Sequence, residues 1–454
     1  SMNHHNSPNA ALQELTARGI AEMIQSGAVS AEALSTLFLD YVQATDESIR
    51  AFAYLDRGSI QMQARLLDEG RARGGDVGRL SGVPVAVKDA FDTFDMPTEY
   101  GSKSLAGRQP RWDATAVKKL REAGAVVFGK TKLPDFCLGQ AADTRNPHHL
   151  EHTPGGSSSG SAAAVAAGMV PVSIGSQTGG SVIRPASYCG VIGFKPTRGL
   201  ISRAGMQPLS TTLDQVGVFG RNIEDVALVT EVMIGADDSD PITKGILPRH
   251  LLSTCQQEPP FAPKFVFMRT PFWDQMDSGA QEAFEALIEA MGDHVLTIDL
   301  PDVARVAVKR LQTIVDAEFA AAMHEHLVHS SEEVSDRVMT IVKRGRETKA
   351  VDYLKAKDAI DSTASGFDEF FERFDAILTP AALGPALKGL DSTGDPIMNA
   401  LWSYTGMPAI SLPLLQSDEG LPIGVQLVGA RHDDGRLLRT SRWLLDNFDR
   451  ITGE

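Results

Sequence analysis

The chain has 454 residues, of which 43% are hydrophobic, and a formal net charge of -15 at pH 7. This length and apolar content suffice for one large folded domain or for two to three smaller ones. The negative charge argues against a nucleic-acid-binding surface, because a negative field repels phosphates. The basic run that holds Lys343, Arg344 and Arg346 is therefore expected to be a solvated helix face.

Cysteine usage and the N-terminus give expectations about the cellular context. The three cysteines lack the spacing of metal ligands, so the sequence predicts neither a disulfide framework nor a metal site, and a reducing, cytoplasmic location is expected. Residues 1–10 hold no basic region followed by an apolar one, so no secretory signal is predicted. We interpret residues 1–8 as a tag or a disordered start. The most apolar stretch, 162–174, is interrupted by Gly168 and Pro171 and is too short to cross a membrane.

Helical and strand patterns alternate along the first third of the chain. Apolar residues recur at helical spacing from Leu12 to Leu67, which predicts two or three amphipathic helices before any strand. Two short β-branched runs follow, Val83–Val87 and Ala125–Gly129, and the segment between them at 114–123 has a helical pattern. A strand, a helix and a strand at this spacing are typical of a parallel pair in an α/β fold.

The rest of the chain continues this mixture. Ile223–Met233 is a predicted helix with Asn222 as its N-cap, and residues 302–374 show helical pattern almost throughout. Short buried strands are predicted at Ala376–Pro380 and Pro408–Pro413. Because no repeat and no low-complexity linker interrupts the chain, one large interleaved α/β domain is expected.

The segment from Thr153 to Gly199 is the most informative part of the sequence. It holds ten of the 41 glycines together with eight serines. Gly179 and Gly180 precede Ser181, and successive glycines can arrange N–H groups as a concave donor set that would hold an oxyanion. A tight turn that happens to contain a serine explains this triplet equally well.

A second serine-rich loop makes the functional interpretation stronger. Gly155–Gly160 contains Ser157, which lies 24 residues before Ser181. A helix followed by an antiparallel strand fits into that separation, and this arrangement could bring the two serines close together. A serine-rich helix N-terminus would also explain this loop by itself.

A serine nucleophile needs a base, and the sequence offers lysine or histidine. Lys88 ends the apolar run Val83–Val87, so its amine is expected to emerge from a buried strand, where desolvation lowers its pKa. An ion pair with the neighbouring Asp89 is the alternative, and the residues alone leave both open. Three histidines near the serines occupy a polar run that is typical of an exposed loop, with no G-x-S-x-G nucleophile elbow nearby: His148, His149 and His152.

Several longer motifs together resemble a known family. They read GVPVAVKD at 82–89, PGGSSSGSAAAVAAG at 154–168, GSQTGGS at 175–181 and CGVIGFKPTRG at 189–199, and continue as LDQVG at 213–217, ILTPA at 377–381, GMPAISLP at 406–413 and GLPIGVQLVG at 420–429. In this order they resemble the amidase signature family of serine hydrolases over nearly the whole chain after Ala51. The resemblance implies a single α/β domain at 9–454 whose central twisted mixed sheet is covered by helices on both faces. Its expected parts are a helical layer at 9–75, the signature core at 80–235 and a helical region on the substrate side at 302–374.

The resemblance also implies roles for the site residues. Ser181 would be the nucleophile, Ser157 a bridging serine that follows a cis peptide bond, and Lys88 the general base. The amides around Thr178, Gly179, Gly180 and Ser181 would form the oxyanion hole. Lys88 would accept a proton through Ser157 as Ser181 attacks, and the relay would return one to the leaving nitrogen. No cofactor and no metal are implied.

The sequence departs from the family pattern beside the nucleophile. Gln177 stands where the family often has Asp, and Arg184 stands one position later than the arginine of many members. A neutral hydrogen bond from Gln177 is therefore expected in place of a buried Asp–Arg pair. The segment 131–146 is also short, and it places Cys137 near a wall expected to touch substrate. A small buried apolar residue is the alternative interpretation of Cys137.

Three kinds of function are compatible with these features. The first is an amidase that hydrolyses a small carboxamide to an acid plus ammonia or an amine. The second is the glutaminase-like A subunit of a tRNA-dependent amidotransferase, and the third, a binding protein on a hydrolase scaffold, is disfavoured because all three triad positions are intact. The expected partner is a small-molecule amide, with no nucleic acid and no membrane, and a homodimer is allowed.

Overall fold

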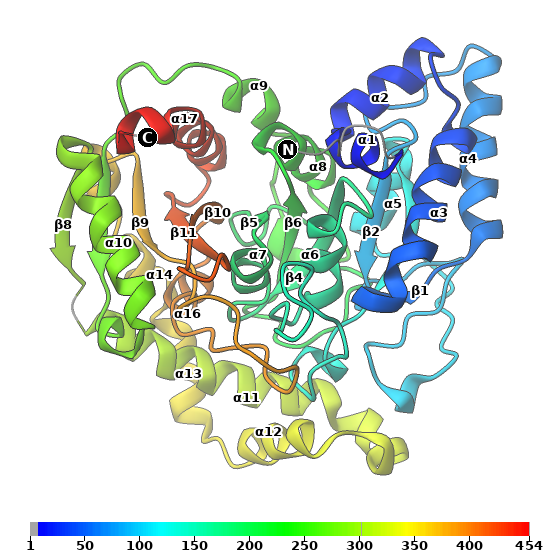
Figure 1. The fold of residues 1–454 in the computed structure, drawn as a ribbon. Helices are drawn as coiled ribbons and strands as arrows, with labels where there is room; N and C mark the ends of the chain where they lie inside the picture. The colour runs from blue at the N-terminus through cyan, green and yellow to red at the C-terminus, as the bar shows by residue number, and fades with distance from the viewer. Residues whose placement is uncertain (1–7, 301, 454) are drawn as a thin grey trace.

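A computed structural model describes residues 8–300 and 302–453, which fold around one mixed β-sheet of eleven strands (Figure 1). The strand order across the sheet is β1-β3-β2-β4-β6-β5-β10-β11-β9-β7-β8. The strands are β1 Phe52–Tyr54, β2 Pro84–Lys88, β3 Val126–Thr131, β4 Val172–Gln177, β5 Ile192–Lys195, β6 Gln215–Gly220, β7 Phe265–Arg269, β8 Val295–Asp299, β9 Ala376–Pro380, β10 Ala409–Gln416 and β11 Pro422–Val428. The expected α/β class with a central mixed sheet is confirmed.

Two groups of parallel strands flank a block of antiparallel strands in the sheet. β2 runs parallel to both of its neighbours, β3 and β4, and β7 runs parallel to β8 and β9. The strands between these groups, from β4 through β6, β5, β10 and β11 to β9, pair antiparallel. The predicted strand–helix–strand unit is confirmed, because β2 and β3 are parallel and α5 (Thr115–Glu122) connects them.

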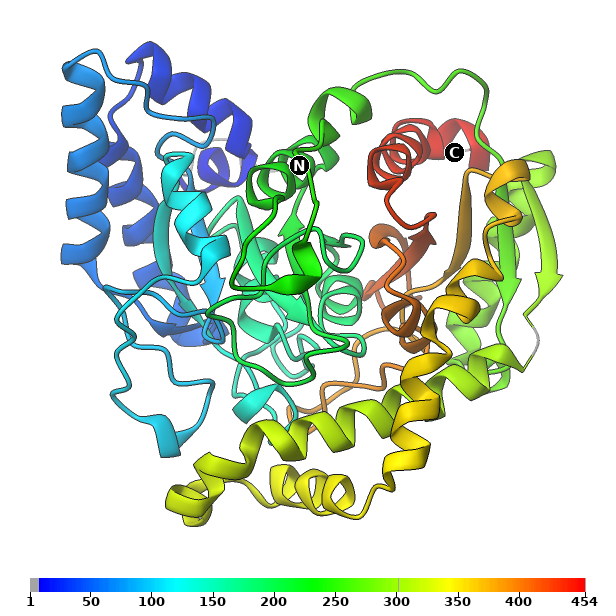
Figure 2. The ribbon, with the colours of Figure 1, turned by 180° about the vertical axis from the view of Figure 1, so that it is seen from behind.

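Helices cover both faces of the sheet (Figures 1 and 2). The helices not yet given are α1 Pro8–Glu14, α2 Ala17–Ser26, α3 Ala31–Ile49, α4 Arg57–Ala72, α6 Ser159–Ala166, α7 Ile183–Cys189, α8 Ile223–Met233, α9 Leu251–Cys255, α10 Ser278–Met291, α11 Val303–Ser330, α12 Asp336–Arg346, α13 Ala350–Asp358, α14 Ile360–Ser365, α15 Phe370–Arg373, α16 Ala400–Thr405 and α17 Asp434–Thr452. Short 3-10 helices lie at Lys103–Leu105, Asp135–Cys137, Pro241–Thr243, Trp273–Gln275, Gly292–His294 and Ser331–Glu333. Among the described residues, no helix is long and apolar enough to cross a membrane.

The N-terminal region differs from its prediction in one respect. The expected helices are present as α2, α3 and α4, but β1 lies between α3 and α4 and pairs antiparallel with β3 at the edge of the sheet. The prediction that all the helices of the span Leu12–Leu67 come before any strand is therefore wrong, because a strand of three residues is too short to show periodicity. The predicted tag at 1–8 lies outside the described residues, apart from Pro8, where α1 begins.

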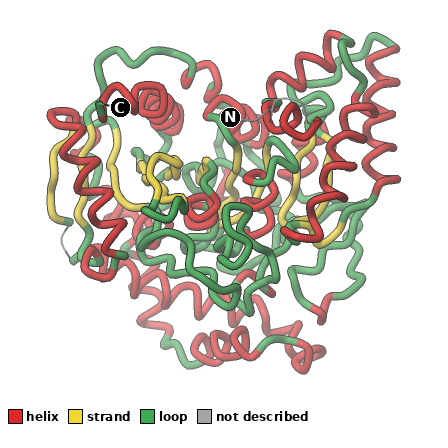
Figure 3. The backbone as a smooth tube through the Cα atoms, in the orientation of Figure 1, coloured by secondary structure: helices red, strands yellow, loops and turns green. Residues whose placement is uncertain are grey.

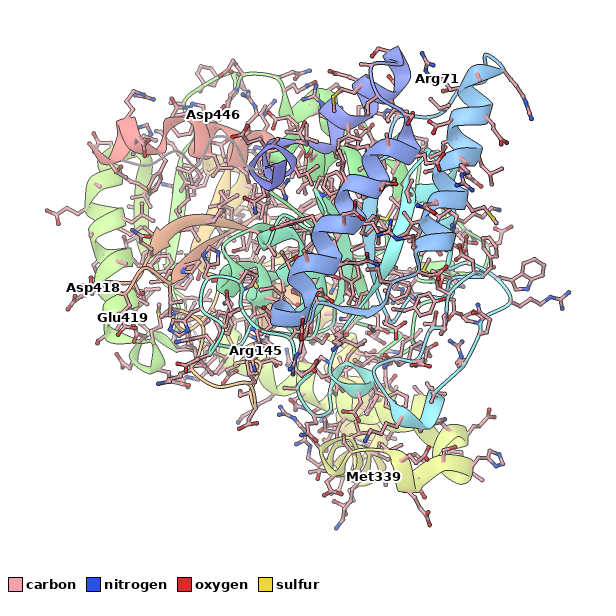
Figure 4. The ribbon with its side chains drawn as sticks, turned by 45° about the vertical axis from the view of Figure 1, so that its right-hand side comes forward. Arg71, Arg145, Met339, Asp418, Glu419 and Asp446 are labelled. Carbon is pink, nitrogen blue, oxygen red and sulfur yellow. The ribbon has the colours of Figure 1, made fainter. Side chains whose placement is uncertain are left out.

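The helical region predicted at 302–374 is present as α11 to α15. In Figures 1 and 2, α11 and α12 lie along the bottom of the molecule, below the strands. Figure 4, which turns the molecule, shows Met339 on α12 at this lower side. α8 begins after Asn222, whose side chain accepts a hydrogen bond from the amide of Asp225, so the predicted N-cap is also confirmed.

Candidate active site

Sheet topology brings Lys88 and the loop of Ser181 to the same edge of the sheet. β2 and β4 are parallel neighbours, so their carboxyl ends lie side by side. Lys88 is the last residue of β2, and Ser181 follows the end of β4 by four residues. Ser157 lies before α6, and the amide of Ser158 donates a hydrogen bond to the carbonyl of Ser181 at 3.3 Å. Figure 3 shows loops gathered between the strands and the helices at the bottom of the view.

Lys88 is fully buried among serine hydroxyls. Its Nζ lies 2.6 Å from Oγ of Ser157, 2.8 Å from Oγ of Ser176 and 3.1 Å from Oγ of Ser158. Burial lowers the pKa of Lys88, because removal from water disfavours the charged amine. The Gly156–Ser157 peptide bond is cis, as the resemblance implied. These contacts suit an amine that exchanges a proton with the Ser157 hydroxyl.

The ion pair considered for Lys88 and Asp89 is not formed. Oδ1 of Asp89 lies 3.0 Å from Nζ of Lys130, which is a buried residue of β3. Asp89 follows the last residue of β2, and its carboxylate contacts Lys130 instead of the serines around Lys88. The alternative interpretation of Lys88 as a structural ion-pair partner of its neighbour is therefore wrong.

The loop between β4 and α7 presents backbone donors. The amides of Gly179, Gly180 and Ser181 donate no hydrogen bond to any residue within 8–300 and 302–453. Three successive amides without a protein partner beside a serine can hold an oxyanion. The hydroxyls of Ser157 and Ser181 make no direct hydrogen bond in this state, although their loops are in contact.

Gln177 holds this loop by neutral hydrogen bonds. Its Oε1 accepts from the amides of Val182 at 2.8 Å and Ile183 at 3.0 Å, and its Nε2 donates to Oγ of Ser403 at 2.9 Å. Ser403 in turn donates to the carbonyl of Gly179. Ile183 occupies the place of the arginine found in many members, so the neutral bracing expected for Gln177 is what the geometry shows.

A cavity of about 400 Å³ opens in front of Ser181. The loop 178–181 forms one side of it, and Cys137 and Leu138 form another. α11 and α12 close it with side chains that include Gln312 and Ile341. The helical region expected on the substrate side thus lines the cavity beside the predicted nucleophile.

Cys137 lies at the cavity wall where it was expected, whereas Arg344 was not expected there. Cys137 is partly exposed rather than buried, lines the cavity, and donates from Sγ to Oε1 of Gln207 at 3.5 Å. Arg344 does lie on an exposed helix face, yet it also lines the cavity and pairs with Asp316 at 2.9 Å. The cavity is lined by elements that are distant in sequence, so a local sequence pattern does not reveal which side chains meet there.

The three histidines stand apart from the serines. Ring nitrogens of His148 and His152 hydrogen-bond to the carbonyls of Cys189 and Ala386, at 2.8 and 2.9 Å. His148 and His149 are exposed as expected, but His152 is buried. No hydrogen bond joins any of these described histidines to Ser157 or Ser181.

Two further residues of the site were not singled out from the sequence. Ser176 contacts Lys88, and Asp214 accepts a hydrogen bond from Oγ1 of Thr178 at 2.8 Å. Burial raises the pKa of Asp214 to about 6. Both lie inside motifs quoted above, GSQTGGS and LDQVG, so membership of those motifs was the signal available.

Comparison with known proteins agrees with this geometry. A family model described as Amidase matches residues 33–438. The chain belongs to the amidase family. It is 34% identical to the A subunit of the glutamyl-tRNA(Gln) amidotransferase from Carboxydothermus hydrogenoformans, over 96% of this chain and 98% of that relative. The corresponding protein of the same name from Alkaliphilus metalliredigens is also 34% identical, over 89% and 90%.

Solved structures of this family superpose along most of the chain. A chain from a vestigial protein complex that bears on the origins of an s-triazine catabolic enzyme has a TM-score of 0.88 and 29% identity, over 95% of this amidase-family chain and 98% of its own. The peptide amidase of Stenotrophomonas maltophilia has a TM-score of 0.83 and 27% identity, over 95% and 97%. Since both match nearly end to end, the family fold extends over the helical region as well as the core.

Proposed function

We propose that this amidase-family protein hydrolyses a carboxamide through an acyl-enzyme on Ser181. The observation that carries the proposal is the chain of contacts from buried Lys88 to Ser157, set beside the free amides of Gly179, Gly180 and Ser181. A neutral amine supplies a base, and the amides supply donors for the oxygen that becomes negative in the transition state. Small shifts would close the relay between Ser157 and Ser181, because the two loops already touch.

The reaction follows from these roles. Oγ of Ser181 attacks the carbonyl carbon, its proton passes through Ser157 to Lys88, and the amides hold the oxyanion. The C–N bond then breaks as the relay returns the proton to the leaving nitrogen, which departs as ammonia or an amine. Water attacks the acyl-enzyme by the same relay and releases the carboxylic acid with Ser181 restored.

The proposal is tested with a fluorophosphonate probe and an ammonia-release assay. We expect the probe to label Ser181 and the protein to release ammonia from primary carboxamides, whereas Ser181→Ala does neither and keeps its fold by circular dichroism. Peptide mapping that places the probe on Cys137 would overturn the assignment of Ser181. EDTA is expected to have no effect, since no group of three potential metal ligands lies among the described residues.

A second candidate is the ammonia-supplying A subunit of an amidotransferase. The names of the relatives at 34% identity support this role more directly than a stand-alone amidase. Both roles use the same hydrolytic chemistry, so they differ in substrate and assembly. Glutamine turnover that depends on co-purifying subunits would select the second candidate, and turnover of other amides by the isolated chain would select the first. Homodimer formation and a cytoplasmic location stay predictions.

A further inference from the structure

An arginine with an unused donor lies beside the predicted nucleophile. Arg184 follows Ser181 by three residues, is only 5% exposed and lines the cavity. Its Nε donates to the carbonyl of Thr393 and its Nη2 to that of Gly156, each at 2.7 Å. Nη1 has no hydrogen-bond partner among the residues that the structure describes.

The charge of Arg184 also has no counterion in contact. No carboxylate of residues 8–300 or 302–453 comes within ion-pair distance of it, and carbonyl groups do not neutralise a guanidinium. Asp395 is the carboxylate that acts on it through space, and Tyr188 and Arg337 are its other charged or titratable neighbours. Burial lowers the pKa of Arg184, because the cation has lost water without gaining an anion. A buried unpaired charge is costly, so an anionic ligand at Nη1 would be favoured.

The rest of the cavity wall has the same sign. Arg337 and Arg344 on α12 complete a set of three arginines, and no Asp or Glu among the described residues lines the cavity. Arg344 is compensated by Asp316, whereas exposed Arg337 makes no hydrogen bond or ion pair with a described residue. A positive cavity is unexpected in a chain with a net charge of -15, so its sign points to the ligand rather than to the composition.

The position of Nη1 limits where the anion can sit. A Cβ built on Gly180 would lie 2.7 Å from Nη1, so the guanidinium lies against the predicted oxyanion loop. Neighbouring Cα atoms are about 3.8 Å apart, which places Nη1 within roughly 8 Å of Cα of Ser181. An anion bound there is separated from the attacked carbonyl by a short spacer. Asn399 approaches the same face of Gly180 with a free Oδ1, but Asn399 does not line the cavity.

We propose that the Arg184 guanidinium and the Arg337 side chain form a carboxylate subsite, so that the substrate is a short amide that carries a carboxylate, a monoamide of a dicarboxylic acid. This inference rests on the proposed function and names its substrate class. A free α-ammonium group has no carboxylate to pair with on the described cavity wall, so the subsite favours a simple amido acid over an amino acid amide such as glutamine.

Matched pairs of substrates test the subsite on the wild-type protein. Succinamate and butanamide differ in the carboxylate, and glutaramate and glutamine differ in the ammonium group. Hydrogen bonds to charged groups are stronger than those between neutral groups, so kcat/KM is expected to be roughly 10- to 100-fold higher for succinamate than for butanamide. High salt screens charges and should reduce this difference. Glutaramate is expected to exceed glutamine. Equal values for succinamate and butanamide would overturn the carboxylate subsite while leaving the proposed function intact, and equal values for glutaramate and glutamine would overturn the exclusion of the ammonium group.

Variants on α12 supply a control that spares the loop of Ser157, since Arg184 itself braces Gly156. Arg337→Gln is expected to raise KM for succinamate several-fold and to affect butanamide less. Lys343→Gln, an exposed residue of the same helix that does not line the cavity, is expected to change neither. Equal effects of the two variants would contradict a local subsite.

A binding readout separates failure of the subsite from failure of the proposed function. Succinate is expected to slow fluorophosphonate labelling of Ser181, and butanamide, which carries no carboxylate, is expected to have less effect. If no amide is hydrolysed but succinate still protects Ser181 and Arg337→Gln weakens that protection, the subsite stands and the proposed hydrolysis is wrong. If succinate and butanamide protect equally, the subsite is wrong, and Arg184 serves only to cross-link the carbonyls of Gly156 and Thr393.

Discussion

Replacement of Lys88 by methionine removes the predicted base and keeps most of the side-chain volume. Lys88 is 0% exposed and its Nζ contacts three serine hydroxyls, so no solvent-borne base reaches Ser157 from that side. A positioned general base accelerates a reaction by about 10²- to 10⁴-fold. When the base belongs to a catalytic triad, its removal lowers the rate by at least the upper value. We therefore expect amide turnover to fall by about 10⁴-fold, which corresponds to roughly 5.5 kcal/mol in the barrier.

The pH dependence of the same variant has a definite sign. Because burial lowers the pKa of Lys88 from its ordinary value of 10.5, the neutral base forms at lower pH than in a free lysine. The acylation rate should rise with pH through this lowered pKa and then level off, and Lys88→Met should lack the rise. Unfolded chains hold the proton up to about pH 10.4, so the free energy of unfolding should also increase with pH between the two pKa values in the wild type.

The assay is the rate at which a fluorophosphonate labels Ser181, followed from about pH 6 to pH 10, a range that extends to just below the pKa of a free lysine. An activated ester is expected to lose less activity than an amide in Lys88→Met, because a good leaving group needs no returned proton. The matched control is Lys130→Met, another buried lysine, which pairs with Asp89. That change should cost about 3–5 kcal/mol of stability and preserve the pH profile. A Lys88→Met protein with the wild-type pH profile would refute the relay, and the three histidines would be tested next.

The other predictions concern the nucleophile and the groups that hold its loop. Ser181→Ala should abolish probe labelling with an unchanged melting temperature, and residual hydrolysis near the wild-type rate would contradict the acyl-enzyme. Gln177→Leu leaves the amides of Val182 and Ile183 without their acceptor, so the free energy of unfolding should fall by about 1–3 kcal/mol and probe labelling of Ser181 should slow. Chemical denaturation measures the free energy of unfolding. An unchanged value would show that Gln177 does not stabilise this loop. Burial raises the pKa of Asp214 to about 6, so the folded state binds the proton more tightly and stability should fall by roughly 3 kcal/mol as the pH rises from about 4 to 6. Asp214→Asn should lack that fall, and identical stability profiles for the two proteins would show that Asp214 does not titrate there.

Local pattern was sufficient for the elements whose signal lies within a few residues. The run Val83–Val87, the helix at 114–123 and the run at Ala125–Gly129 predicted β2, α5 and β3, because burial, helical period and spacing are all encoded there. The N-cap at Asn222 was likewise visible, since capping needs a polar side chain and an amide three residues away. β7 and β8 were not foreseen, although the equally short β2 and β9 were; no residue of β8 is buried, so no run of buried residues marks that strand.

For the active site too, some features could be predicted from sequence motifs and others were decided only by the tertiary structure. The order of motifs was enough to select Lys88, Ser157 and Ser181, and their roles remain proposals that the geometry supports. Only the tertiary structure decided that Asp89 turns to Lys130, since the pairing of β2 with β3 joins residues about forty positions apart.

The same holds for the charge of the cavity. The sequence showed that Arg184 stands one position late, but its direction depends on carbonyls of Gly156 and Thr393, which lie 28 and 209 residues away. Arg344 was predicted on a solvated helix face and Arg337 was not singled out, but α12 packs against α11, and both arginines line the cavity beside Ser181. The packing of helices and strands determines which distant segments are in contact, and the hydrophobic periodicity of a single segment does not predict that packing.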